Sequence, residues 1–393
     1  MKKFTKLSLV AAVAVAGLTS ANAKPLEEAI KDVDVSGTVT YRYDNFGNDK
    51  TGETNNANKY KINFNLSSKV NDYVKFNSRF NVGSTSTNND FVNLDKAAGT
   101  GDTNKGVDLA HAYFGLSVIP NTTVNVGKQG LATPWTVATD NDGAEQTGTG
   151  IFSVTAVDKF VVGLAYFNQT NINNLSDFTA NTFKGSEDIY AATLQANYGI
   201  VNAEAWYLNA VDQFDTYTLA VHGKADLADN ANIGYEVRYV SLDASDMGAG
   251  DTHSLTRVAV NGKVGIVNAR LAYSVTDEKG GITALDTDAQ NASLGWRLNT
   301  LNKADAKFLQ ATLGADILDN LNFSVSYNSL EYKAAADAVT GVNKDPKQNE
   351  VFAQLTYKMS KNLDGYIRYG QQDMDKANDS KENSGRLQVN YKF

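Results

Sequence analysis

The chain has 393 residues, of which 42% are hydrophobic and 20% are charged, and its formal net charge is −8. Such acidity argues against nucleic acid as a partner, because a phosphate backbone attracts basic surfaces. The chain contains no cysteine, which excludes disulfides and thiolate metal ligands as supports of the fold. It has only 4 prolines but 31 glycines, 19 tyrosines and 17 phenylalanines, and few helix-period segments, so we expect a large all-β protein.

Residues 1–23 have the features of a cleaved secretory signal peptide. Three lysines lie among the first six residues, an apolar run covers residues 7–18, and residues 21–23 form an Ala-Asn-Ala cleavage site. The apolar run is too short for a membrane-spanning helix. We expect a mature chain that starts at Lys24, keeps 33 of the 36 basic residues against 44 acidic ones, and has a net charge of −11.

After this segment, apolar and polar residues alternate with a period of two in many stretches. Each stretch is about 9–12 residues long, the length of a tilted strand that crosses a hydrocarbon layer. Aromatic residues collect at the ends of the stretches, and charged residues lie in the middle of the polar faces, which favours a barrel with a wet lumen over a soluble β-sandwich or solenoid. The clearest stretches are residues 35–43, 60–66, 74–82, 217–221, 233–239, 267–275, 323–327, 351–357 and 387–393.

Short and long connections alternate between these stretches. Eight short links lie near residues 70–72, 119–122, 157–159, 199–200, 226–230, 265, 318–320 and 359–362. Nine outer links lie near residues 44–58, 84–106, 130–148, 169–187, 211–214, 242–252, 277–305, 333–347 and 372–384. This pattern predicts a transmembrane antiparallel β-barrel of about 18 strands over residues 34–393, with short periplasmic turns and long extracellular loops. Residues 24–33 are then a short periplasmic segment.

Two parts of the chain bear on the strand count and on closure. Residues 289–298 also alternate and would make a nineteenth strand, but a single-chain bacterial barrel closes with an even number, so we assign them to an outer loop. The final stretch ends on Tyr391 and Phe393, and an unpaired edge there would invite aggregation. We expect it to pair with the first strand, which closes the barrel and satisfies its backbone groups.

Several segments resemble the major outer membrane porins of Campylobacter and relatives. They are "LSLVAA", "ANAKPLEEAIKDVDVSGTVTYRYD", the run "GKQ", "PW" and "DG...GTG" between residues 127 and 150, and the ending "VNYKF". The resemblance implies a bacterial outer-membrane location, an 18-stranded barrel that is usually trimeric, and passage of small hydrophilic solutes. It also implies that the third outer loop folds into the pore, and that Tyr391 and Phe393 are read by the barrel-assembly machinery. The second outer loop (84–106) is long enough to reach a neighbouring subunit.

The expected constriction combines charges of both signs, because a barrel of this width stays open unless something enters it. The inward-folded loop 130–148 carries acidic residues, and the first three strands place only basic residues on their inner faces. A basic wall that faces an acidic loop would tune ion selectivity, although ordinary solvated lumen residues are the alternative. Acidic loops at the mouth favour weak cation selectivity. The candidates are Asp140, Asp142 and Glu145 in the loop and Arg42, Lys59, Lys61, Lys75 and Arg79 on the wall.

Metal motifs are weak, and no cofactor is required by the sequence. Residues 32–37 imitate the start of a calcium loop, but the twelfth position is Tyr43 instead of Glu. The family resemblance implies calcium near the constriction of such porins, with Asp142 and Asp177 as the candidate ligands.

Catalysis finds little support in the sequence. The three histidines lie outside zinc-protease and nucleophile-elbow motifs, and Walker A and dinucleotide-binding motifs are absent. We therefore expect a porin and no enzyme. The alternative is a surface adhesin or structural outer-membrane protein in which the channel is secondary.

Overall fold

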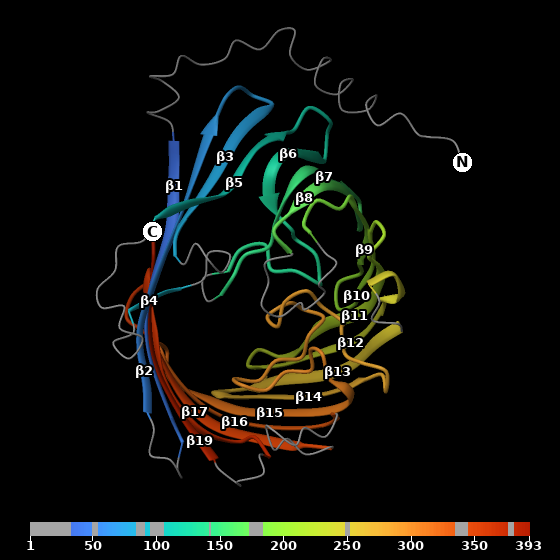
Figure 1. Ribbon diagram of the computed structural model, residues 1–393. Helices are drawn as coiled ribbons and strands as arrows, with labels where there is room; N and C mark the ends of the chain where they lie inside the picture. Colours follow the sequence, from blue (N-terminus) through green and yellow to red (C-terminus); the bar gives the residue numbers. More distant parts are fainter. Residues whose placement is uncertain are drawn as a thin grey trace.

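The structure is a computed structural model that describes residues 33–48, 54–83, 91–94, 106–140, 143–172, 184–247, 252–334, 345–375 and 381–393. The predicted signal peptide and most of the predicted periplasmic segment lie outside these residues. Within them, no helix has the length and hydropathy needed to cross a membrane. Figure 1 shows a ring of strands with irregular segments inside it.

Nineteen strands of the described residues make up a single sheet. The strands are β1 (Val33–Asn48), β2 (Thr54–Lys69), β3 (Val74–Val82), β4 (Val92–Leu94), β5 (Val107–Leu116), β6 (Thr122–Gly130), β7 (Thr147–Val157), β8 (Phe160–Thr170), β9 (Ile189–Asn197), β10 (Asn202–Ala210), β11 (Phe214–Ala228), β12 (Ala231–Asp243), β13 (Thr252–Val264), β14 (Val267–Thr276), β15 (Ala304–Leu318), β16 (Leu321–Lys333), β17 (Lys347–Lys358), β18 (Leu363–Asp373) and β19 (Lys381–Lys392). A 3-10 turn, η2 (Ser245–Met247), follows β12.

The sheet closes into a barrel of 18 antiparallel strands, as the alternation predicted. The extra strand, β4, has three residues and pairs with β2 at Asn58–Tyr60, next to where the pairing of β2 with β3 ends at Ile62. It therefore continues the position of β3 beside β2 and adds no strand to the ring. Residues 289–298 contribute no barrel strand, and their one bridge pairs Leu294 with Asn299, just beyond the range.

The first two strands are longer than the alternation predicted. Both have 16 residues, and β1 continues to Asn48 although an outer link was expected from residue 44. The added residues are mostly polar, since a strand that rises above the hydrocarbon layer no longer needs an apolar outer face. The extension has a consequence for the lumen, because it places Asp44 on the inner face of β1.

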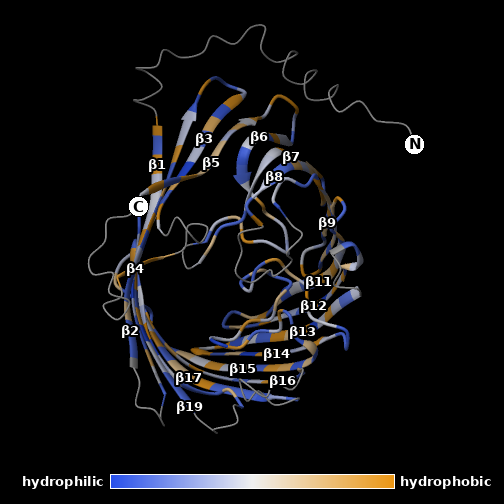
Figure 2. Ribbon diagram, viewed as in Figure 1, coloured by the Kyte–Doolittle hydropathy of each residue, from blue (hydrophilic) through white to orange (hydrophobic). Residues whose placement is uncertain are grey.

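Alternation along each strand separates an apolar outer face from a polar inner face. Val258, Leu271 and Val325 are each more than 40% exposed on the outside, which is the expected state of a lipid-facing side chain without its lipid. Figure 2 shows the resulting change between hydrophobic and hydrophilic residues along the strands. The short connections are tight turns, and Gly265 between β13 and β14 has a positive φ of 58° that favours glycine.

The last strand pairs with the first over eleven residue pairs, from Thr38↔Lys392 to Asn48↔Glu382. Beyond the register, Gly37 N–H donates to the Phe393 carbonyl at 2.9 Å, and Phe393 N–H donates to the Gly37 carbonyl at 3.1 Å. A Cβ at Gly37 would lie 2.2 Å from the Asn63 carbonyl oxygen and 2.7 Å from the Phe393 ring, so only glycine fits. We call this β1–β19 junction the seam. The predicted pairing of the first and last strands is confirmed.

Candidate functional site

The described part of the connection from β6 to β7 lies inside the barrel, and we call residues 131–140 and 143–146 the first inward segment (Figure 1). It is folded on itself, because Leu131 N–H donates to the Gln146 carbonyl and Gln146 N–H to the Val137 carbonyl, at 2.9 and 2.8 Å. Leu131 and Trp135 are buried in an apolar cluster with Phe167 of β8 and Leu208 of β10. The barrel wall thus supplies an apolar seat for one side of the segment.

A buried carboxylate fixes the other side of the first inward segment to β3. Glu145 is fully buried, and Arg79 of β3 donates to it from Nε at 3.0–3.1 Å and from Nη2 at 2.5 Å. Asn81 Nδ2 and the Asp140 N–H also donate to this carboxylate, at 2.9 and 3.0 Å. Burial alone would raise the pKa of Glu145, but the hydrogen bonds and charge of Arg79 outweigh it and hold that pKa below its ordinary value of 4.5.

A buried lysine of β2 holds the backbone of the same segment. Lys61 Nζ donates to the Asp140 carbonyl at 2.8 Å and to the Gly143 carbonyl at 2.5 Å. The Lys61 side chain has no exposed surface. Charge-assisted hydrogen bonds of this kind are stronger than neutral ones, so Lys61 and Arg79 together form a clamp on the first inward segment.

This geometry corrects the expected basic wall that faces the acidic loop across an open gap. Lys61 and Arg79 touch the loop directly, whereas Lys75 is exposed near the start of β3. Arg42 and Lys59 belong to a different group of charges. Alternation predicts the face on which a side chain lies, but it does not predict depth in the lumen or the contact partner.

The second group of charges surrounds Asp44 at the seam. Arg386 of β19 donates to Asp44 from Nε at 2.6 Å, and Lys59 Nζ lies 3.3 Å from the same fully buried carboxylate. Arg42 Nε donates to Gln388 at 2.8 Å. Arg368 of β18 is the cross-strand partner of Arg386. Sequence reasoning missed Asp44 and Arg386 as site residues, because residue 44 was assigned to an outer link.

The connection from β14 to β15 also lies inside the barrel, although an outer loop was expected. We call residues 281–303 the second inward segment, and many of its side chains, such as Leu285 and Leu298, are buried. Arg257 Nη1 donates to the Ala292 carbonyl at 2.9 Å, and Ser274 shares a 2.6 Å hydrogen bond with Ser293. The alternation at 289–298 therefore belongs to a segment that packs against the inner wall. Packing on one side favours alternating apolar and polar residues, as it does in a strand.

The two inward segments are joined to each other. Leu285 N–H donates to the Trp135 carbonyl at 2.8 Å, and Asn291 N–H donates to the Pro134 carbonyl at 2.9 Å. Gln146 Nε2 also donates to Asp286 at 2.6 Å. These bonds connect backbone to backbone and buried side chain to side chain, so the segments form one unit.

The far end of the second inward segment reaches the wall near the seam. The buried Glu350 of β17 accepts the Trp296 and Arg297 N–H groups at 2.7 and 2.8 Å. The Arg297 guanidinium lies 4.5 Å from the centre of the Phe46 ring of β1 and 3.7 Å from Glu382 of β19. Because the first segment attaches to β2 and β3, the joined segments extend from β2 past β10 and β17 to the seam. We call them the collar.

The acidic candidates for the constriction and for calcium differ in exposure, and two of them lie outside the described residues. Asp140 is partly exposed and Glu145 is buried, while Asp142 and Asp177 lie outside the described residues. Asp288 of the second inward segment is exposed, and it borders Gly143, as Asp140 does. Among the described residues, no three His, Cys, Asp or Glu side chains form a metal-binding group. Calcium at Asp142 and Asp177 stays a prediction.

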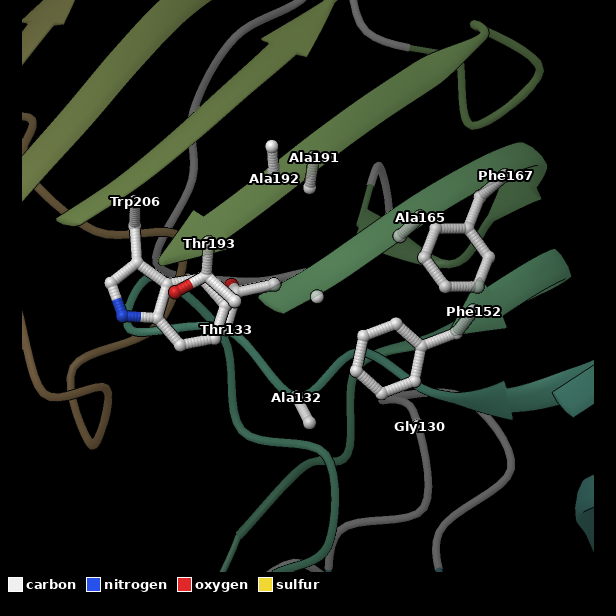
Figure 3. A pocket seen from close by; sticks show the side chains of 11 residues that line it. Gly130, Ala132, Thr133, Phe152, Ala165, Phe167, Ala191, Ala192, Thr193 and Trp206 are labelled. Carbon is white, nitrogen blue, oxygen red and sulfur yellow. The ribbon is translucent and has the colours of Figure 1, made fainter. Parts of the chain in front are cut away.

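A small pocket lies where the first inward segment meets the wall (Figure 3). Gly130, Ala132 and Thr133 form one side, and the opposite side comes from β7 to β10. Small residues such as Ala165 and Ala191 leave room between the Phe152 and Trp206 rings. The pocket is mainly apolar, and it belongs to the seat of the segment.

The barrel resembles solved outer-membrane structures at low sequence identity. Pseudomonas aeruginosa OccK2 (OpdF) aligns with a TM-score of 0.75 and 14% identity over 92% of this chain and 98% of that chain. Acinetobacter baumannii OccAB4 aligns with a TM-score of 0.71 and 14% identity, over 92% and 98% of the two chains. Pseudomonas aeruginosa OpdL aligns with a TM-score of 0.74 and 13% identity, over 92% and 99%. At these identities the likeness shows the fold.

The sequence comparison identifies the family. No curated protein matches the chain. The family described as Campylobacter major outer membrane protein matches residues 1–393, the whole chain. The 18-stranded barrel, with its apolar outer face and polar inner face, is that of an outer-membrane porin. The chain therefore belongs to the Campylobacter major outer membrane protein family.

Proposed function

We propose that the channel passes ions and small hydrophilic solutes passively, with weak cation selectivity, through a passage that the collar narrows. The observation that supports this proposal is the placement of charge on the collar. Asp288 is exposed on it and Asp140 is partly exposed, while Lys61 and Arg79 are buried in the clamp. The cations near the seam act in the opposite direction, so the preference for cations is weak. The family and the fold are those of a channel, and the proposal includes no catalytic step.

Reversal potentials in planar bilayers across a KCl gradient test this proposal. We expect discrete conductance steps and a small potential of cation-selective sign, which declines as the Debye length falls below ~10 Å above 0.1 M salt. Neutral or anion selectivity would contradict the proposed selectivity. A purified, inserted barrel without conductance steps would contradict the channel and favour an adhesin or a structural role.

Calcium binding at Asp142 and Asp177 is a second part of the proposal and rests on the family resemblance. Carboxylates are suitable ligands for calcium, and one bound ion would reduce the negative charge of the constriction. We expect calcium, and not an equal ionic strength of NaCl, to shift the reversal potential toward anions. The variant Asp142→Asn should lose this shift, and an unchanged calcium response would argue against Asp142 as a ligand.

We further propose a homotrimer, supported by a patch of small and polar residues on the outside of the short strands. Phe152 packs in the lumen, so the neighbouring Ser153 and Thr155 point outward, where Thr155 shares a 2.9 Å hydrogen bond with Thr122. Lys128 also lies on this side and donates to the Leu109 carbonyl at 2.7 Å. Polar side chains at this position pack better against protein than against lipid.

Mass photometry in mild detergent tests this oligomeric state. The double variant Ser153→Leu, Thr155→Leu should shift the population from trimer toward monomer, because larger side chains disturb a packed interface. The matched control is Val258→Leu on β13, which should leave the trimer intact. A wild-type monomer, or equal trimer in both variants, would contradict the proposed interface.

We propose lastly that the barrel-assembly machinery reads Tyr391 and Phe393. Both rings are exposed on the outer face, and their centres are 5.9 Å apart in a stacked arrangement. Phe393→Ala should lower the amount of folded barrel in the outer membrane without affecting export across the inner membrane. Normal amounts of folded barrel would argue against this role.

A further inference from the structure

Arg368 on the inner face of β18 has an unusual setting for a luminal cation. Its neighbours Ile367 and Tyr369 are 56% and 63% exposed on the outer face, so Arg368 points into the lumen. Its guanidinium carbon lies 5.1–5.2 Å from the centres of three aromatic rings, which belong to Trp296, Phe352 and Tyr366. Trp296 comes from the collar and the other two rings from the wall, so the setting exists only while the second inward segment is in place.

The hydrogen bonds of Arg368 leave one side of its guanidinium open. Nε donates to Gln354 at 2.7 Å, which fixes the rotation of the planar group. Among the described residues, neither Nη nitrogen donates to a protein acceptor, and neither is buried without a partner, so both remain accessible from the lumen. Two parallel N–H groups on one side of a fixed guanidinium match the two oxygens of a carboxylate.

The carboxylates nearest to Arg368 are occupied by other groups. Asp44 is shared by Arg386 and Lys59, and Glu350 accepts two backbone N–H groups of the second inward segment as well as Asn328 Nδ2 at 2.7 Å. Within the described part of the chain, Arg368 has no carboxylate within salt-bridge distance. It also stands directly across from Arg386, and like charges on opposite strand positions repel. An anion from solution would relieve this repulsion.

We propose that Arg368, with Trp296 and Tyr366 beside it, is a binding subsite for small organic carboxylates inside the channel. The rings exclude water from the faces of the guanidinium, which strengthens a hydrogen bond to a charged ligand at its edge. Arg386 adds positive charge from the neighbouring strand. The inference rests on the proposed channel function and gives that function a solute class, because a weakly cation-selective passage would otherwise disfavour organic anions.

Single-channel recordings with added benzoate test the subsite, with benzamide as an uncharged ligand of the same shape. We expect benzoate to block the wild-type current in discrete events and benzamide to leave it unchanged. Arg368→Gln should raise the half-blocking concentration about tenfold or more, since charged hydrogen bonds are lost. The matched control is Arg270→Gln, which removes an exposed luminal cation from β14 and should change that concentration less than about twofold.

Arg368→Lys separates charge from geometry and provides a second variant with a conserved charge. A lysine keeps the positive field but loses the planar pair of donors, so its half-blocking concentration should lie between the wild type and Arg368→Gln. Equal weakening by Arg368→Gln and Arg270→Gln would overturn the subsite in favour of a general luminal field. Equal block by benzoate and benzamide would overturn it as well. Absence of any wild-type conductance would reject the channel itself, a result distinct from conducting channels without Arg368-dependent block.

Discussion

The replacement Glu145→Gln is expected to release the first inward segment from the barrel wall. The carboxylate of Glu145 accepts hydrogen bonds from Arg79, Asn81 and the Asp140 N–H, and it is fully buried. A glutamine keeps the size of the side chain but loses the charge. The Arg79 side chain, which is only 6% exposed, would then remain as a buried cation without its counterion.

The expected cost follows from this burial. Removal of one partner from a buried ion pair costs about 3–5 kcal/mol, because the remaining charge is not solvated. Such a loss changes the equilibrium between attached and released segment by roughly a hundredfold to several thousandfold. The attachments at Lys61 and at the second inward segment remain, so the segment should alternate between two positions and not leave the lumen permanently.

Single-channel recording measures the effect. We expect Glu145→Gln to give a larger mean conductance and frequent steps between two levels, where the wild type shows one. The control is Asp364→Asn on β18, a wall carboxylate that is 30% exposed and lies 3.7 Å from Lys392. An exposed pair of this kind contributes about 0–1 kcal/mol, so its removal should leave conductance unchanged.

A double variant separates the ion pair from a general change of shape. With Arg79→Gln and Glu145→Gln together, neither member of the ion pair is left buried without its partner, so the second conductance level should be rarer than in Glu145→Gln alone. A single conductance level in Glu145→Gln, or the same behaviour in Asp364→Asn, would refute the assignment of Glu145 and Arg79 as a clamp.

Three further outcomes are expected. Because the pKa of Glu145 is lowered in the attached state, the clamp should be fully stable above the ordinary pKa of 4.5 and weaken only as pH falls through the lowered value. Wild-type conductance should therefore be the same at pH 7 and pH 5 and rise in more acidic buffer. A conductance that does not change with pH would contradict this prediction. Glu350→Gln should loosen the second inward segment and speed tryptic cleavage after Arg297, and unchanged cleavage would count against the anchoring role of Glu350. Gly37→Ala should lower the temperature at which the folded band is lost in gel electrophoresis, because overpacking at the seam costs about 1–3 kcal/mol. An unchanged temperature would show that the seam can accommodate the added methyl group.

The barrel wall was predictable from the sequence because its physical rule is local. A strand between lipid and water must alternate, and a short turn between two such strands carries residues such as Gly265 that permit the turn. The rule extends to closure, since the edges of β1 and β19 need partners. It becomes inaccurate only above the hydrocarbon layer, where β1 and β2 continue with polar residues on both faces.

The collar was harder to predict because its contacts join distant parts of the chain. Glu145 and Arg79 were candidates by charge, but their direct contact depends on the depth to which the first inward segment descends. The second inward segment alternates in residues 289–298 and has the composition of an outer loop, so no local feature shows that it turns inward. Its position is decided by partners such as Arg257 and Glu350, whose spacing along the sequence carries no recognisable pattern.

The seam has a consequence for the time course of assembly. Its two strands are separated by about 350 positions along the chain, as the Thr40–Asn390 hydrogen bond shows, whereas most other described neighbours are consecutive strands. Ring closure over such a separation carries a larger entropic cost and is slow compared with hairpin formation. Until it occurs, β1 and β19 both present unpaired backbone groups. A strand-like peptide matched to either edge would therefore act as an inhibitor only during this interval and would have no target on the finished barrel.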